Sequence, residues 1–271
     1  MSTSVHPRVL RPVTPAGLLA ERLRRLRARA DELPGDLAEA LREAHDLAVG
    51  LEPYIGHCTS PASPALADLA ARTCARDWAD RPHGTVALEA EMLSGHVEGA
   101  VLRFLVALSG ARHVLEVGMF TGYSALAMAE VLPDDGHLIA CELDPDVAAF
   151  AEEQFASTPA GRHIEVRVGP AADTLAALAE EHHRFGFVFI DADKAGYLEY
   201  LMTILDGDLL APGGMIAVDN TLLQGEPYLP AEPSPNGRAI AQFNAAVAGD
   251  PRIEQVLLGV RDGLTLIRRV G

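Results

Sequence analysis

Residues 113–126 read HVLEVGMFTGYSAL, a short apolar run that continues through two glycines into a helical pattern. The run is apolar on both faces, which is typical of a strand in a parallel sheet that helices cover on both sides. Gly118 and Gly122 allow the backbone of the turn to come close to a ligand. This stretch therefore predicts the first strand, turn and helix of an α/β fold, with a ligand site at the turn.

Similar strand patterns recur downstream and alternate with helical ones. The apolar runs are HLIACE (137–142), HIEVRV (163–168), FGFVFID (185–191) and GMIAVD (214–219). Their alternation with helices predicts a doubly wound, mostly parallel sheet. The end of the chain differs, because IEQVLLG (253–259) and GLTLIRRV (263–270) are separated by only three residues. These two runs predict an antiparallel C-terminal hairpin.

The residues before this region have a helical texture. Pro34-Gly35 and the turn-rich stretch 57–64 interrupt the pattern, and Ser63-Pro64 is typical of a helix start. A further helix is expected to bury one face that carries Leu93, Val97, Val101, Phe104 and Leu108. We expect an N-terminal helical extension over residues 1–83 and an α/β domain over residues 84–271.

Composition restricts the possible partners. The chain of 271 residues has a net charge of −16, although its first 30 residues hold seven Arg and one Glu. An acidic body repels phosphate backbones, so we expect no nucleic acid partner. No apolar run approaches the ~20 residues of a membrane span, so no membrane partner is expected.

The three cysteines are far apart and form no CxxC pair. Their spacing argues against a disulfide framework and fits a cytoplasmic protein. Cys74 lies at helical spacing with Leu66 and Ala70, which predicts a small residue of the core.

Polar side chains follow the predicted strands at their carboxyl ends, where ligands bind in such sheets. Glu142 ends the second strand, as expected for a carboxylate that binds a ribose diol. The turn after the first strand lacks the GxGxxG spacing of dinucleotide sites, because position 120 is Phe. These features alone leave both a nicotinamide cofactor and S-adenosylmethionine open.

Asp191, Asp219 and Asn220 end the fourth and fifth strands. If these strands are neighbours, the three side chains converge into a hard oxygen site of the kind that Mg²⁺ prefers. The alternative is that they cap the helices that follow. Lys194 is the only lysine of the chain. A lysine can release its proton where an arginine cannot, so a role in proton transfer competes with that of an incidental surface residue.

With these residues the chain resembles the cation-dependent O-methyltransferases of the catechol and caffeoyl-coenzyme-A type. The resemblance covers residues ~85–270 and rests on a small set of motifs. They are VLEVGMFTGYSA, ACELD, the GPA of 169–171, FIDADK, VDN and DGLTL (262–266).

The resemblance implies a Rossmann-like methyltransferase with a seven-stranded sheet that binds S-adenosylmethionine. The cofactor-binding residues that it implies are Met92, Ser94, Glu116, Gly118, Met119, Phe120, Ser124, Glu142, Ala171 and Asp193. It also implies a divalent cation, most simply Mg²⁺, on Asp191, Asp219 and Asn220. Lys194 would be the catalytic base, and Asp191 would take part in catalysis through the metal.

We therefore expect methyl transfer to a hydroxyl of a catechol-like or ortho-hydroxylated aromatic small molecule. The Arg-biased, alanine-rich composition suggests a GC-rich bacterial source, hence a bacterial secondary metabolite. The amphipathic N-terminal helices need a surface to pack on, so we expect them either to cover the acceptor or to contribute to a homodimer. Two alternatives stay open: a nicotinamide-dependent oxidoreductase on a Rossmann-like fold, and a non-catalytic ligand-binding module.

Overall fold

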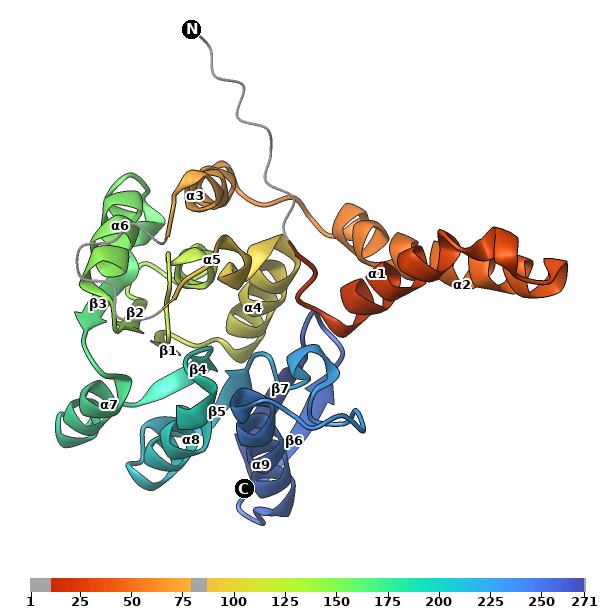
Figure 1. Ribbon diagram of the computed structural model, residues 1–271. Coiled ribbons are helices and arrows are strands. Elements are labelled where there is room, and N and C mark those ends of the chain that lie inside the picture. The colour runs from red at the N-terminus through yellow and green to blue at the C-terminus, as the bar shows by residue number, and fades with distance from the viewer. Residues whose placement is uncertain (1–10, 79–86, 271) are drawn as a thin grey trace, which may run out of the picture.

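The computed structural model describes residues 11–78 and 87–270 (Figure 1). Its strands are β1 (His113–Val117), β2 (His137–Glu142), β3 (Ile164–Val168), β4 (Phe185–Ile190), β5 (Leu210–Val218), β6 (Ile253–Leu258) and β7 (Leu264–Arg269). The helices before β1 are α1 (Pro15–Arg27), α2 (Gly35–Cys58), α3 (Pro64–Ala75) and α4 (Gly95–Ser109). Those after β1 are α5 (Tyr123–Ala129), α6 (Pro145–Ala156), α7 (Ala171–Glu180), α8 (Tyr197–Asp206) and α9 (Pro235–Gly249).

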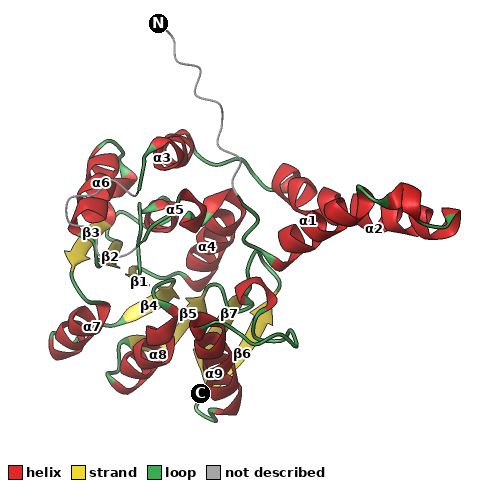
Figure 2. Cartoon of the chain, viewed as in Figure 1, coloured by secondary structure: helices red, strands yellow, loops and turns green. Residues whose placement is uncertain are grey.

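The strands of the described residues form one seven-stranded sheet in the order β3-β2-β1-β4-β5-β7-β6 (Figure 2). Strands β1 to β5 are parallel, while β7 runs antiparallel to both β5 and β6. The doubly wound sheet with an antiparallel C-terminal hairpin is therefore confirmed. The strand order reverses between β1 and β4, and sheets of this kind bind ligands at such a switch point.

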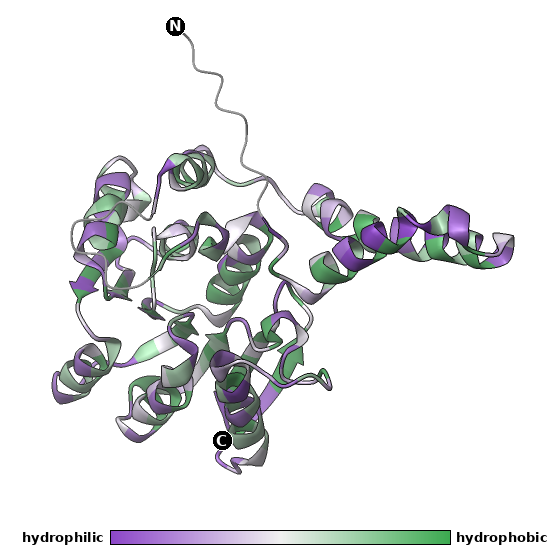
Figure 3. Cartoon of the chain, in the orientation of Figure 1, coloured by the Kyte–Doolittle hydropathy of each residue, from purple (hydrophilic) through white to green (hydrophobic). Residues whose placement is uncertain are grey.

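Helices cover both faces of the sheet because successive side chains of each strand point to opposite sides. In β4, Val188 and Ile190 belong to the core under α7, α8 and α9, whereas Phe187 and Phe189 belong to the core under α3, α4, α5 and α6. Figure 3 shows the central strands in the colour of apolar residues. Burial on both faces explains why these strands are apolar without alternation.

The N-terminal helices divide into two groups. Helices α1 and α2 pack on each other and extend away from the body (Figure 1). Helix α3 instead buries Leu66 and Leu69 in the core that contains α4 and α5. The predicted start of α3 is confirmed, because the Ser63 hydroxyl accepts a hydrogen bond from the amide of Leu66. The expected domain boundary between residues 83 and 84 lies outside the described residues.

Two expectations about burial were wrong. Helix α4 buries Glu98, Gly99, Leu102 and Val106, while Phe104 and Leu108 are 67% and 80% exposed. Gly99 explains the choice of face, since a Cβ there would lie 2.8 Å from the Tyr123 ring, so α4 approaches α5 closely along this side. Cys74 is exposed, because α3 turns Leu66, Leu69 and Thr73 inward instead.

Within the described residues, Ala90–Ser109 is the one stretch whose length and apolar composition would suit a membrane span. In this fold its inner face packs against α5.

The two leucines of α4 test which face is buried. Leu102→Ala should lower the free energy of unfolding by about 3 kcal/mol, because it leaves a cavity in the core. Leu108→Ala should change it by less than about 0.5 kcal/mol. Urea denaturation of both variants measures the difference. Equal losses would contradict the packing of α4.

Candidate active site

The ends of β1, β4 and β5 lie in one row at the switch point. The Asp191 amide donates to the carbonyl of Val117 (2.9 Å), and the Asp219 amide donates to the carbonyl of Ile190 (3.0 Å). The expectation that the fourth and fifth strands are neighbours is confirmed. The residues just beyond each strand therefore face a common space.

The turn after β1 requires a glycine at position 118. Gly118 has a φ of +90°, and a Cβ there would lie 2.2 Å from the carbonyl oxygen of Asp191. Only a residue without a side chain lets the two backbones come this close. The turn thus borders a cleft that is lined by Met92, Leu93, Ser94, Gly118, Met119, Phe120, Thr121, Tyr123, Ser124 and Asp191.

Six of the ten residues expected to bind the cofactor line this cleft, and Glu116 lies beneath it at the end of β1. Glu116 is fully buried, and neither of its oxygens accepts a hydrogen bond from the described residues. Burial raises its pKa well above the usual value for a glutamate. The Ser124 hydroxyl partly offsets this rise in the pKa, yet both oxygens can still accept hydrogen bonds. This suits a ligand that brings a donor, such as the ammonium group of S-adenosylmethionine.

Glu142 ends β2 and is tied to the same turn. Its Oε2 accepts the amide of Phe120 (2.8 Å), and its Oε1 accepts the amide of Asp144 (2.9 Å). Burial raises the pKa of Glu142. Each oxygen keeps a lone pair, so this oriented carboxylate fits the two hydroxyls of a ribose.

The other two expected cofactor residues lie at neighbouring strand ends. Ala171 is the first residue of α7, beyond β3. Asp193 follows β4, and both of its oxygens already have partners: Oδ2 accepts the amide of Gly196 (3.0 Å), and Oδ1 accepts the Tyr200 hydroxyl (2.5 Å). These contacts make Asp193 the cap of the short helical turn Lys194–Gly196.

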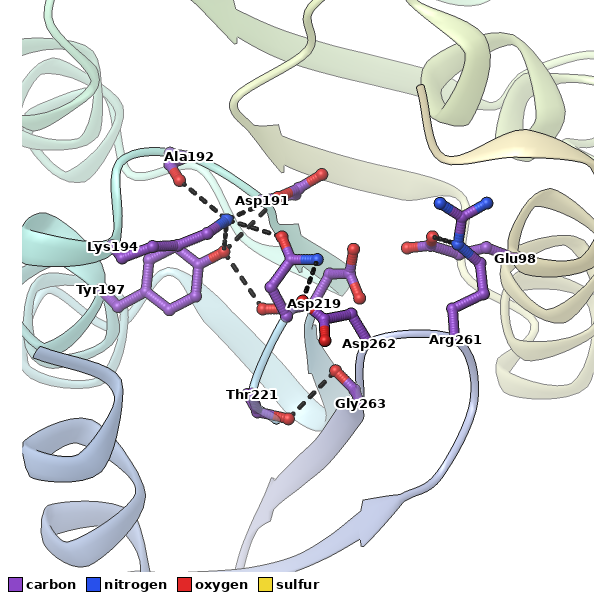
Figure 4. A network of polar contacts seen from close by, with 11 residues as sticks. Glu98, Asp191, Ala192, Lys194, Tyr197, Asp219, Thr221, Arg261, Asp262 and Gly263 are labelled. Atoms are coloured by element: carbon purple, nitrogen blue, oxygen red, sulfur yellow. Dashed lines mark hydrogen bonds and ion pairs between the residues drawn. The ribbon is translucent and has the colours of Figure 1, made fainter. Parts of the chain in front are cut away.

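The amine of Lys194 joins the ends of β4 and β5 (Figure 4). Its Nζ lies within hydrogen-bonding distance of Oδ1 of Asp191 (2.9 Å), Oδ1 of Asn220 (2.7 Å), the Tyr197 hydroxyl (2.7 Å) and the carbonyl of Ala192 (3.1 Å). One atom thus contacts oxygens of Asp191 and Asn220 at once, so the two side chains face the same point. Figure 4 shows Asp219 beside them.

Two further buried carboxyl groups lie beside these residues, and the sequence alone did not point to either of them. Asp262, in the turn between β6 and β7, lies against the amide of Asn220 and accepts the backbone N–H of Gln224 (2.6 Å). Glu98 of α4 forms an ion pair with Arg261, 3.3 Å from its Nε. The sequence did carry a signal for Glu98. It lies at helical spacing with Leu102 and Val106, which places an acidic residue on the buried face of α4.

The close carboxylates disfavour each other's charge. Burial and then Asp191 raise the pKa of Asp219 to about 6, and burial together with Asp219 raises that of Asp262 to about 7. The pKa of Glu98 is raised by burial and by Asp219. These carboxyl groups and Asp191 share only two basic side chains, Lys194 and Arg261, so a bound cation would relieve the repulsion between their charged forms.

The donor types favour a hard cation. No group of three or more His, Cys, Asp or Glu side chains in the described part of the chain is arranged to hold a metal. The candidate set instead combines two carboxylates with the amide oxygen of Asn220. Oxygen-only sites of this kind suit Mg²⁺ and similar ions rather than zinc.

Comparison with known proteins identifies the family. The family model described as O-methyltransferase matches residues 81–270. Tricin synthase 2 of Oryza sativa subsp. japonica is 38% identical over 66% of this chain, which spans 64% of that protein's length. Caffeoyl-CoA O-methyltransferase of Petroselinum crispum is 38% identical over 64% of this chain and 75% of its own length.

Solved structures agree with the sequence relatives. The S-adenosylhomocysteine-bound methyltransferase PaMTH1 of Podospora anserina has a TM-score of 0.73 and 29% identity, over 83% of this chain and 96% of that one. TomG of Streptomyces achromogenes, an O-methyltransferase in complex with S-adenosylmethionine, has a TM-score of 0.67 and 28% identity. The match covers 82% of this chain and 96% of that one. This chain belongs to the O-methyltransferase family of S-adenosylmethionine-dependent enzymes.

Proposed function

We propose that the enzyme transfers a methyl group from S-adenosylmethionine to a hydroxyl of a catechol-like or ortho-hydroxylated aromatic small molecule, with the help of a divalent cation. The family membership supplies the donor and the type of reaction. The observation that carries the rest is the position of Lys194, whose amine contacts the oxygens of both Asp191 and Asn220.

Asp191, Asp219 and Asn220 are the residues that would hold the cation, for which Mg²⁺ is the simplest candidate. The surplus of carboxylates around them favours an ion of charge +2. Such an ion, when bound, supplies a Lewis acid that lowers the pKa of a hydroxyl beside it. Two neighbouring ring oxygens would suit its remaining positions, which is why a catechol is the proposed acceptor.

Lys194 is the proposed base. Asp191 and Asn220 would turn their oxygens to the cation when they hold it, which would leave the Lys194 amine available to the acceptor. The Tyr197 hydroxyl, which also donates to the carbonyl of Asp219 (3.1 Å), keeps the side chain in place. Lys194, with its amine in the neutral form, accepts the hydroxyl proton. The oxygen bonds to the methyl carbon as the carbon–sulfur bond breaks, which leaves S-adenosylhomocysteine.

On the donor side, Glu116, Gly118, Met119, Phe120 and Ser124 would hold the methionine end. Glu142 would bind the ribose, and Ala171 would lie at the adenine. Met92 and Ser94 would cover the cofactor, and Asp193 would touch it. Positioning of the two reactants in this cleft should supply much of the rate.

The acceptor is proposed to be a bacterial secondary metabolite. TomG, which is involved in tomaymycin synthesis, is a bacterial structural relative of this chain that acts in such a setting. A panel of catechols, hydroxyquinones and coenzyme-A esters, assayed with labelled methyl donor, tests the acceptor class. Turnover of none of them would overturn the proposed acceptor class.

Replacement of the base tests its role. Lys194→Ala should lower kcat by about 10²–10⁴-fold, because general-base catalysis is typically worth this much. Lys194→Arg should not restore the rate, since arginine keeps its proton. Calorimetry should show unchanged binding of S-adenosylhomocysteine. A loss of less than about threefold would remove Lys194 from the mechanism.

Metal removal tests the cation. Exhaustive dialysis against EDTA should abolish catechol methylation, and Mg²⁺ should restore it. In calorimetric titrations with Mg²⁺ alone, Asp219→Asn should weaken binding by about tenfold or more, because it removes a charged ligand. Glu199→Gln, an exposed acid on α8, is the control and should bind as wild type. Full activity after chelation, or equal effects of both variants, would contradict the metal site.

We also propose that the arm formed by α1 and α2 packs against a second copy of the chain. The arm extends from the body (Figure 1), and it exposes apolar side chains such as Leu47 and Tyr54, at 78% and 69%. Extended apolar patches of this kind mark interaction sites. Contact with an identical arm would cover both surfaces by one symmetric interface.

Sedimentation equilibrium tests the dimer. Wild type should have twice the monomer mass, and the double variant Leu47→Lys/Tyr54→Lys should have the monomer mass, because two charges would be buried in the interface. Leu108→Lys, which places a charge on the exposed face of α4 outside the arm, should stay dimeric. A monomeric wild type, or dissociation by Leu108→Lys alone, would refute the arm as the interface.

A further inference from the structure

The only tryptophan of the chain is buried against the turn that follows β1. Trp78 lies three residues beyond the end of α3 and is 2% exposed. Its ring centroid is 5.0 Å from that of Phe120 and 5.4 Å from that of Phe150, to which it is edge-on. The Arg76 guanidinium covers the outer side of the cluster, 4.8 Å from the Trp78 centroid and 5.1 Å from that of Phe150.

Hydrogen bonds connect the segment that carries Trp78 to Thr121, the residue that follows Phe120 in the turn. The Trp78 indole donates to the carbonyl of Thr73 (2.9 Å), and the Thr73 hydroxyl donates to that of Thr121 (3.0 Å). Both threonines are fully buried. Residues 73–78 thus hold Phe120 by ring contact and Thr121 by a hydrogen bond. Such specific contacts exceed what a helix needs merely to cover apolar surface.

The turn needs such support because of the backbone of Phe120. Its φ of +51° lies in the left-handed region, which is unfavourable for a residue with a large side chain. A residue keeps such a conformation only where contacts with the surrounding structure hold it there. It also has a purpose, since it directs the Phe120 amide to Oε2 of Glu142 (2.8 Å), the carboxylate proposed for the ribose.

We propose that Trp78 and Thr73 are positioning residues for the methyl donor. They keep Phe120 in its left-handed conformation, and Phe120 in turn orients Glu142. Neither residue needs to touch the cofactor, because each acts through the turn. This inference rests on the proposed donor site, and it makes the segment after α3 a working part of that site rather than an attachment to it.

Calorimetric titration of the full chain with S-adenosylhomocysteine tests the inference. Trp78→Ala should weaken binding about tenfold, and Trp78→Phe, which keeps an aromatic ring on Phe120, should recover most of the affinity. Thr73→Val should weaken binding about threefold. Leu69→Ala is the control, because it removes a buried side chain of α3 that is absent from the Trp78 cluster, and it should change affinity less than twofold. In kinetics, Trp78→Ala should raise KM for the donor, Trp78→Phe should raise it far less, and neither should change KM for the acceptor.

A fifth variant separates failure of this inference from failure of the donor site. Glu142→Gln should weaken binding at least tenfold if the donor site is correct. If Glu142→Gln binds normally, the donor site is wrong. If Glu142→Gln weakens binding but Trp78→Ala stays within twofold of wild type, or Leu69→Ala weakens it as much as Trp78→Ala, only the positioning role is wrong.

Should Trp78→Ala fail to fold, the wild-type fluorescence still decides. All tryptophan emission comes from Trp78, so a change that saturates together with the calorimetric titration supports the inference. Emission that stays constant while S-adenosylhomocysteine binds would overturn it.

Discussion

The close approach of two backbones at the switch point determines the rest of the site. The turn at Gly118 lies directly against the carbonyl of Asp191, and no side chain would fit between them. Asp191 therefore borders the cleft of the β1 turn and also faces the end of β5. A donor held in the cleft and an acceptor held at the oxygen cluster would lie on two sides of one residue, which would bring the reacting groups together.

The charges around Asp191 follow from the same crowding. Strands β4 and β5 and the β6–β7 turn bring carboxyl groups together, and α4 adds Glu98 from the other side. Lys194 and Arg261 neutralise part of this charge, which leaves an excess of carboxylate in a buried place. A protein retains such an arrangement at a cost in stability, so the arrangement itself points to a function that uses it.

The strands and the residues at their ends could be predicted because the pattern of apolar residues in the sequence marks each strand. Strands buried on both faces are uninterrupted apolar runs, and chain order with strand adjacency then places Asp191, Asp219 and Asn220 together. Features that depend on how elements pack were missed or wrong. The choice of the buried face of α4 depends on Gly99 meeting Tyr123. The role of Trp78 depends on a contact with Phe120, 42 residues away, and the burial of Glu98 depends on a partner in the last hairpin.

A crystal structure with Mn²⁺ and S-adenosylhomocysteine would test the central claim most directly, since Mn²⁺ can be located by its anomalous scattering. The account predicts one ion bound by oxygens of Asp191, Asp219 and Asn220, at roughly 2.0–2.6 Å. It also predicts that the Lys194 amine no longer contacts both Asp191 and Asn220. An ion bound elsewhere, or a Lys194 amine that still joins these two side chains with the ion present, would contradict it.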